Sequence, residues 1–506
     1  MMKRVRGSSK MRFLSVVAAA VFSTLVFIGC EKSPVGPDDD PGNVVSPPVD
    51  VPVAGKTVSQ ILDDGHSALK RNQYDTAMAY YEAAYAKENN NPEAIIYSSL
   101  AKLALISIDP KVADLFRNRM GFTSYPNRFN ALLSSDWLTY ESSLPGLVTP
   151  SWVSKGNNSI YNGSLINGAP SVETWVILLL ANLVDKNTNG LNGFLDDMIA
   201  AVFGTSFTEV NIRIAKLNVN NSNTKITLNS VFLEALNFEN IIGEYDEIGW
   251  AEANAVLSFM TGIKASMEWV ASYDWNTSLN FLKQVWSDNI NDLGPYELIN
   301  SIDAKDLPFN NNFLKARVGK MDAAKASFIK SVEGLQASYE AISTDSKYPA
   351  SIKNAYPTLN DGANKLVTAI KNGTVFYISD NPTNGTWPTS GNGINMGKLF
   401  QPGYFSLQNL FEVDAAGKPV FYTEGVKLTK DNYQELLSEN GYAALKVKTS
   451  HAAAVVVPAQ SQGDEMFELP FFLALWLFEK YNGLPLTNLY VLEKKQPLAK
   501  ALIRKK

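Results

Sequence analysis

Apolar residues recur every three or four positions along the stretch from Asp246 to Trp275, in the order Trp250, Ala253, Leu257, Met260, Ile263 and Met267. This period matches the turn of an α-helix, so it predicts a long helix that presents one apolar stripe to a protein core. A stripe of aromatic residues and methionines at this spacing is typical of packing. We therefore assign it no chemistry.

The pattern changes after residue 345. Gly, Asn, Thr and Pro crowd residues 372–407, and residues 409–428 are typical of two short strands around Ala415–Gly417. The apolar run at residues 469–478 is too short to span a membrane and predicts a buried helix. The fold class we expect is mainly α, with a helical body over residues 57–345 and a smaller, mixed α/β C-terminal region over residues 346–506.

The first helical stretch begins at Ile61 and resembles a tetratricopeptide repeat (TPR). In that family a small residue in the first helix lets the second helix pack closely, and small and aromatic residues alternate along the second helix. Pro92 closes the stretch, and the residues at the spacing of the repeat are Gly65, Tyr74, Ala77, Tyr81 and Ala84. The resemblance implies a helical hairpin over residues 57–92.

Further helical pairs follow the first one. Residues 92–106 and 110–120 have the size of a second hairpin, although they lack the signature of the repeat. Residues 313–335 carry Met321, Ala324 and Phe328 at repeat positions without the early glycine, so they fit a degenerate copy or an ordinary amphipathic hairpin. We expect the body to be a TPR-like α-α array.

The amino terminus has the features of a secretion signal. Five basic residues lie among the first twelve, an uncharged run of 17 residues extends from Phe13 to Gly29, and Cys30 follows as the only cysteine. The end of this run resembles the lipobox of bacterial lipoproteins, with Phe27 where the family usually has Leu. The resemblance implies cleavage after residue 29 and a lipid, such as palmitate, on Cys30. The alternative is a single transmembrane anchor.

Residues 30–56 predict a flexible tether between this anchor and the folded body. They contain many prolines, the acidic triplet Asp38–Asp40 and almost no large apolar side chains, so they bury too little surface to fold. The triplet could instead direct the protein to the cell surface, as acidic clusters do in some lipoproteins. We expect a lipid-anchored protein of the bacterial cell envelope, in the outer membrane. The sequence does not distinguish a protein that faces the periplasm from one that faces the cell surface.

Composition narrows the possible functions. Removing the five basic residues ahead of Cys30 changes the formal net charge from −5 to −10, which argues against nucleic acid as a partner. The two histidines, His66 and His451, lie far apart in sequence, and no phosphate-binding glycine loop or serine elbow is present. We expect a non-catalytic protein.

Residues 185–197 resemble an EF-hand or dockerin-type calcium loop. Oxygen ligands at alternate positions and a glycine at the sixth suit Ca²⁺, and the implied ligands are Asp185, Asn187, Asn189, the carbonyl of Leu191, and Asp196. The eighth position of such a loop is usually apolar, but here it is Asn192. Only two of the implied ligands are carboxylates, which implies weak Ca²⁺ binding with a dissociation constant on the order of 10⁻⁴ to 10⁻³ M. The alternative is a polar turn between helices, with Asn and Gly as caps.

Two classes of function fit these features. A tethered helical array predicts an interaction or scaffold module for a protein partner or small ligand. Trp152 and Trp387 lie in polar stretches, where exposed tryptophan could bind sugars or peptides or instead anchor a loop. The alternative function is therefore nutrient or solute binding, similar to the outer-membrane starch-utilisation lipoproteins, or as an accessory of a periplasmic transporter.

Overall fold

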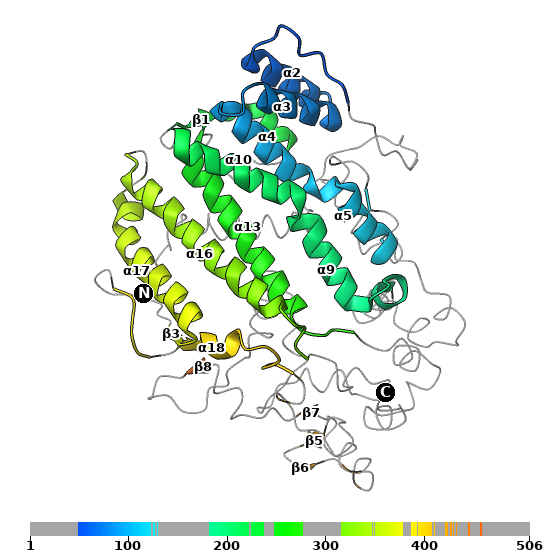
Figure 1. Ribbon diagram of the computed structural model, residues 1–506, viewed down its shortest axis with the longest axis vertical. Helices are drawn as coiled ribbons and strands as arrows, with labels where there is room; N and C mark the ends of the chain where they lie inside the picture. Colours follow the sequence, from blue (N-terminus) through cyan, green and yellow to red (C-terminus); the bar gives the residue numbers. More distant parts are fainter. Residues whose placement is uncertain are drawn as a thin grey trace, which may run out of the picture. The chain divides into compact units, whose positions relative to one another are not determined.

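The computed structural model describes residues 49–122, 182–221, 224–236, 247–276, 315–346, 350–377, 386–391 and 393–406, with short segments between and after these up to residue 457. The described elements are mostly helices with a few short strands, which confirms the mainly α class (Figure 1). They belong to two compact units. The first unit comprises residues 1–148, 196–264 and 330–356, and the second comprises residues 149–195, 265–329 and 357–506.

Three consecutive helices open the first unit: α2 (Val58–Lys70), α3 (Tyr74–Lys87) and α4 (Pro92–Ala104) (Figure 1). Helix α2 begins at a capping box, in which Thr57 and Gln60 each accept a hydrogen bond from the backbone amide of the other. Helix α4 begins with Pro92 behind the cap Asn91. Over the residues for which a second hairpin was predicted, α4 is followed by a 3₁₀ turn (Leu105–Ile108), helix α5 (Pro110–Asp114) and a π turn (Leu115–Arg119).

Helix α4 is buried from Ala94 to Ala101, because later parts of the chain cover it. Helix α10 (Thr205–Asn221) packs along α4, and the short helix α11 (Ser230–Ala235) packs against α2. Strand β1 (Ile226–Thr227) leads into α11 and pairs antiparallel with β2 (Glu247–Ile248). These elements place residues of the 224–236 segment next to the first hairpin.

Helix α13 (Trp250–Ala271) confirms the predicted long helix, and its expected core positions are buried except Met267, which is half-buried. In the first unit it packs against α16 (Lys320–Thr344) through small residues. The Ser331 hydroxyl donates to the Ser258 carbonyl at 2.6 Å, and a Cβ on Gly334 would lie 2.1 Å from the Ser258 hydroxyl oxygen. Only glycine allows this close approach.

The described part of the predicted hairpin at residues 313–335, residues 315–335, does not form two helices. Residues 315–319 form a bridge and a turn, and a single 25-residue helix, α16, begins at Lys320. Gly319 has φ +74, a conformation that favours glycine and ends the turn. Of the three repeat positions, Met321 and Ala324 are buried along this helix and Phe328 is half-buried. The apolar period therefore indicated a helix correctly, but the predicted start of the helix was wrong.

The second unit contains the other described β-strands, β3 to β8. Strands β3 (Val375–Tyr377), β4 (Gly393–Asn395) and β8 (Val456–Val457) form one antiparallel sheet in the order β3-β4-β8. Strands β5 (Phe421–Thr423), β6 (Val426–Lys427) and β7 (Ala444–Leu445) form another in the order β6-β5-β7. Helix α17 (Ala350–Asn372) contributes residues from Pro357 onward, and α18 (Met396–Leu399) follows β4.

Several predicted segments lie outside the described residues. They include the signal peptide, residues 30–48 of the tether, the strand expected before Ala415 and the apolar run 469–478. The predicted boundary at residue 345 falls in the connection between α16 and α17. Within the part of the chain that the structure describes, no helix combines the length and apolar character needed to cross a membrane.

Candidate functional site

An aromatic cluster forms where α2, α3, α4 and α11 meet in the first unit. It contains His66, Tyr81, Tyr97 and Phe232, one from each helix. The Phe232 side chain is fully buried, and its ring centroid lies 4.9 Å from that of Tyr97 and 5.7 Å from that of Tyr81, both edge-on. Nδ1 of His66 and the Tyr81 hydroxyl share a hydrogen bond of 2.9 Å.

Tyr97 also contacts the backbone of the segment that carries Phe232. The Asn229 amide donates to the Tyr97 hydroxyl at 2.7 Å, and that hydroxyl lies 3.4 Å from the Thr227 carbonyl, to which it donates. Asn229 in turn caps α11, since its side chain accepts from the Val231 amide. One tyrosine therefore holds an extended backbone just before it turns into a helix.

Burial controls the ionisation of this cluster. It lowers the pKa of His66 to about 4, against a smaller opposing effect of the Asp63 carboxylate. It raises the pKa of Tyr97 to about 12 and that of Tyr81 further still. At neutral pH the cluster is uncharged, which suits its apolar surroundings.

We predict that the free energy of unfolding falls as the pH drops from 6.5 to 4. A histidine whose pKa is lowered by folding binds its proton more readily in the unfolded chain, so acid favours unfolding in this window. Imidazole titration by NMR should give a midpoint near pH 4 for His66. In His66→Phe the stability should be flatter over the same window. An unchanged slope in that variant would assign the acid sensitivity to other groups.

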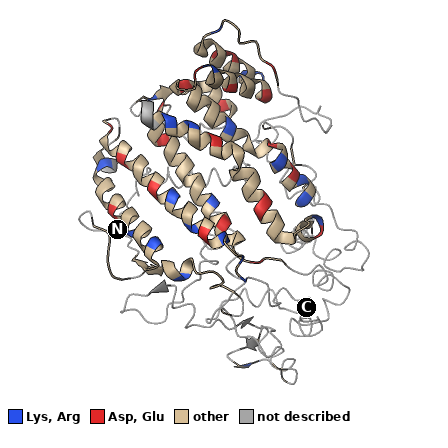
Figure 2. Cartoon of the chain, in the orientation of Figure 1, with Lys and Arg blue, Asp and Glu red and all other residues tan. Residues whose placement is uncertain are grey.

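A charged seam joins α3, α4 and α10 in the first unit. The Arg213 guanidinium, whose side chain is only 8% exposed, donates two hydrogen bonds of 2.7 Å to the Glu82 carboxylate. It also lies over the Tyr85 ring, 4.2 Å from the ring centroid. Lys102 pairs with Glu209 and lies 3.5 Å from Glu82. Figure 2 shows acidic and basic positions on the helices of this seam. Burial would lower the pKa of Arg213, but the Glu82 carboxylate outweighs it and raises that pKa.

A second ion cluster secures the start of α13. The Lys225 ammonium lies 2.7 Å from the Glu252 carboxylate and 2.8 Å from that of Asp345. The Tyr348 hydroxyl donates to Glu252 as well. Burial would raise the pKa of Glu252, but the hydrogen bonds from Lys225 and Tyr348 lower it overall. Each charge thus has a partner of opposite sign, as an anchoring role requires.

The connection between the two helices at the expected calcium loop is shorter than an EF-hand loop, and most of the expected ligands lie in the helices themselves. Asp185 is exposed near the end of a helical stretch at residues 182–186, and Leu191 and Asp196 lie in α9 (Gly190–Phe203). Residues 187–189 alone connect the two helices. Gly190 has φ +59 at the start of α9, as expected for the alternative polar turn.

Side chains of the same turn are engaged in hydrogen bonds. The Asn187 amide donates to the Leu183 carbonyl at 2.6 Å. Asn192, which departed from the calcium pattern, donates to the Asp274 carboxylate at 2.8 Å and accepts from the Trp275 amide at 2.8 Å. Among the described residues, no three His, Cys, Asp or Glu side chains gather as they would around a metal ion. Calcium binding stays a prediction.

The calcium interpretation predicts that Ca²⁺ at ten times its dissociation constant stabilises the fold by about 1.4 kcal/mol. Mg²⁺ should stabilise less, because it favours a smaller octahedral site. Asp185→Ala should abolish the response and cost little in chelator. Thermal melts of both proteins in Ca²⁺ and in chelator measure these effects. If Ca²⁺ changes the melting temperature of neither the native chain nor Asp185→Ala, the polar turn is the remaining interpretation.

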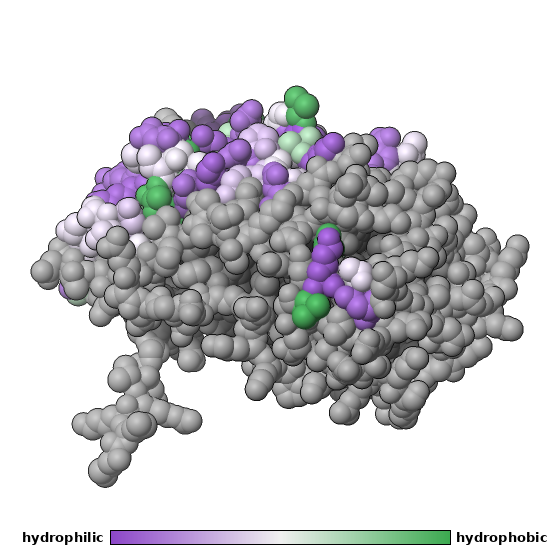
Figure 3. All heavy atoms as spheres, turned by 90° about the horizontal axis from the view of Figure 1, so that it is seen from below, coloured by the Kyte–Doolittle hydropathy of each residue, from purple (hydrophilic) through white to green (hydrophobic). Residues whose placement is uncertain are grey.

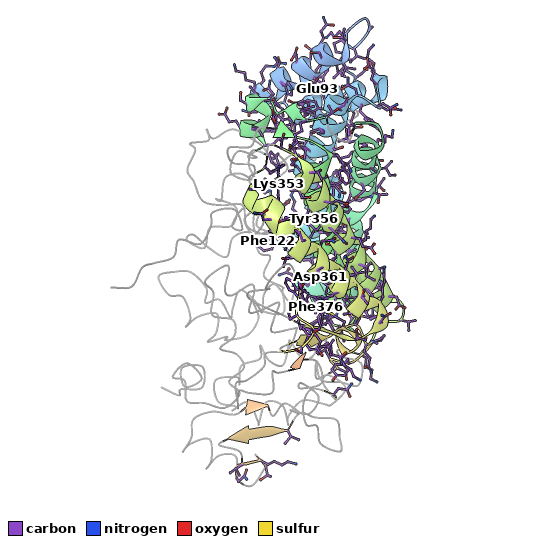
Figure 4. All side chains as sticks on the ribbon, turned by 90° about the vertical axis from the view of Figure 1, so that its left-hand side faces the viewer. Glu93, Phe122, Lys353, Tyr356, Asp361 and Phe376 are labelled. Atoms are coloured by element: carbon purple, nitrogen blue, oxygen red, sulfur yellow. The ribbon has the colours of Figure 1, made fainter. Side chains whose placement is uncertain are left out.

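Trp387 anchors a loop in the second unit. Its indole N–H donates to the Tyr377 carbonyl at 2.6 Å, and its ring stacks on Phe376 at 5.8 Å between centroids. Its backbone amide donates to the Asp361 carboxylate at 2.5 Å. Figure 4 labels Asp361 on α17 and Phe376 on β3. The hydrogen bond from Lys365, followed by that from Trp387, lowers the pKa of Asp361. The ring is thus half-buried in packing contacts. Trp152 and Cys30 lie outside the described residues.

Exposed large apolar residues are scattered over the described part of the chain. They are Val49, Ile212, Val318, Leu359 and Val426, which come from different elements. On the face seen in Figure 3 the apolar residues form separate spots among polar ones. Single exposed apolar residues are common on soluble proteins and do not define a binding surface.

The comparisons with known proteins returned no match. No protein-family model, no curated protein and no solved structure is similar to this chain at a significant level.

The sequence did not identify Phe232, Tyr97 or Arg213 as residues of interest. Arg213 could have been found, because it lies on the buried side of α10 beside Val210 and Ile214. A charged residue among apolar positions of a helix indicates a buried ion pair. Phe232 lies in a helix of six residues, which is too short to show a period.

Proposed function

We propose that the chain is a lipid-anchored lipoprotein of the bacterial cell envelope, in the outer membrane, and that it acts as a non-catalytic interaction module through TPR-like paired helices. The close packing of α2 on α3 supports this proposal best. A Cβ on Gly65 would lie 2.7 Å from Cε1 of Tyr81, so glycine is required where the two helices approach. Stacked pairs of this kind present extended surfaces for binding.

The alternative of nutrient or solute binding rests on exposed aromatic residues. Trp387 is committed to Phe376, Tyr377 and Asp361, so its ring does not favour this alternative. Protease shaving of intact cells separates the two functions in part. Cleavage of the folded body at the cell surface would favour nutrient capture, whereas protection would favour a module that faces the periplasm.

We predict that Cys30→Ser abolishes acyl labelling. The variant should remain as unprocessed precursor or be released from the membrane, because the thiol that carries the lipid is missing. Metabolic labelling with an alkyne fatty acid and membrane fractionation measure both effects. Labelling at the level of the native chain would contradict the lipid anchor.

Cross-linking in cells tests the interaction role. A photoreactive amino acid is placed in turn at Ser59, Asp63 and Ser67, three exposed positions of α2, in the full chain. An interaction module should give one discrete product of the same mass at neighbouring positions. The same positions in Cys30→Ser serve as the control, since an envelope partner should no longer be reached. A scan of all exposed positions on α2 and α3 without any discrete product would contradict the proposal for this surface.

A further inference from the structure

The segment of residues 224–236 packs against α2 and is hydrogen-bonded through its backbone to Tyr97 of α4. Its buried apolar residues are Ile226, Leu228, Phe232 and Leu236. Ile226 and Leu228 are two residues apart, as on one face of a strand, whereas Leu228, Phe232 and Leu236 are each four residues apart, as on one face of a helix. The segment thus enters in extended form and continues as a short helix.

Two features of helices α2, α3 and α4 contact this segment. The Tyr97 hydroxyl contacts the backbone at Thr227 and Asn229, which any sequence offers. The rings of His66, Tyr81 and Tyr97 surround Phe232, with centroids 6.3, 5.7 and 4.9 Å away, which selects an aromatic side chain. Backbone contacts with one aromatic anchor in a closed pocket are typical of peptide recognition.

We propose that helices α2, α3 and α4 carry a peptide-recognition site that is filled here by the chain's own residues 224–236, and that it accepts an equivalent segment of a partner protein. The partner segment has an extended, apolar stretch, then Asn as a helix cap, then an aromatic residue three positions later. The own segment occupies the site until a partner competes with it. This inference rests on the proposed function, because it names the partner chemistry of the same paired helices.

The experiment uses the full chain with Phe232→Ala, which empties the aromatic pocket, and a synthetic peptide with the sequence of residues 224–236. The His66 imidazole reports on occupancy, because burial holds its pKa near 4. In the variant that pKa should rise toward its ordinary value, and the peptide at about 1 mM should lower it again. The chain has two histidines, so His66→Gln assigns the resonance.

Matched peptides test the specificity. A peptide with Ala at the position of Phe232 should leave the pKa of His66 in the variant unchanged. A peptide with Ala at the position of Asn229 should bind about fivefold more weakly, since it loses the helix cap. If Phe232→Ala does not fold, Phe232→Leu serves as the host with the same titration.

If the Phe232 variant is folded and the Phe-containing peptide does not change the pKa of His66, the inference is overturned and residues 224–236 are simply part of the core. An equal response to the peptide with Ala in place of Phe would also overturn it. Both results leave the cross-linking test on the exposed face of α2 untouched. Failure of the peptide site and failure of the interaction role are therefore distinguishable.

Discussion

Replacing Glu82 by Gln is expected to lower the free energy of unfolding by about 3 kcal/mol, the lower end of the cost of breaking a buried ion pair. The change removes the charge that balances the Arg213 guanidinium, which is only 8% exposed. Arg213 remains charged, and its next carboxylate, that of Glu209, lies 3.7 Å away. The loss follows from leaving a buried cation without its bidentate partner.

Arg213→Met should cost less, about 1 to 2 kcal/mol. The carboxylate it leaves behind is 34% exposed and lies 3.5 Å from Lys102, so water and that lysine can compensate it. Methionine also keeps an apolar chain over the Tyr85 ring. Urea unfolding of the two single variants and the double variant measures this asymmetry.

The double variant Glu82→Gln/Arg213→Met should be no less stable than Arg213→Met alone, since no buried charge remains without a partner. Lys216→Met is a control on the same helix, because it removes one hydrogen bond to Tyr85 and leaves the buried pair intact. A larger loss for Arg213→Met than for Glu82→Gln would show that packing, and not the unbalanced cation, determines the energy of this seam.

The helices that the sequence predicted correctly are those with a long apolar period. The stretch at residues 246–275 predicted α13, and Pro92 marked the start of α4. Both signals are local, since a period and a helix-starting proline depend on residues within a few turns. The mainly α class follows from such signals.

Contacts between distant residues could not be predicted in this way. Tyr97 and Asn229 are 132 residues apart, and Glu82 and Arg213 are 131 apart. Nothing in either local pattern specifies the partner, because many surfaces of an α-helical protein offer a tyrosine or a carboxylate. The aromatic cluster and the charged seam are therefore products of tertiary packing.

The stretch Asp185–Asp196 shows a different limit. Oxygen-bearing residues at alternate positions suit a calcium loop only if the backbone stays in loop form over the whole stretch. Here α9 begins at Gly190, in the middle of the stretch. The spacing of side chains alone does not determine where a helix begins, and the same Asn and Gly residues also favour a turn with helix caps.

Gly65→Leu is expected to destabilise the first unit by about 3 kcal/mol, the upper end of the usual cost of overpacking. The atoms beyond Cβ would enter the space of the Tyr81 ring, whose nearest carbon would lie 2.7 Å from Cβ itself. Tyr81 cannot move aside easily. The Tyr81 side chain is fully buried, hydrogen-bonded to His66 and stacked on the Tyr97 ring, with 5.9 Å between the ring centroids.

Two matched variants make this result specific. In an open helix Gly→Ala stabilises by about 1 kcal/mol through helix propensity, whereas Gly65→Ala should bring no gain, because its Cβ already meets the tyrosine ring. Ser67→Leu places the same leucine on the exposed side of α2 and should change stability by less than about 0.5 kcal/mol. Chemical unfolding, with the His66 resonance as a local probe, measures all three. A loss for Gly65→Leu as small as that for Ser67→Leu would mean that α2 and α3 do not pack through this glycine, and the paired-helix basis of the proposed function would fail with it.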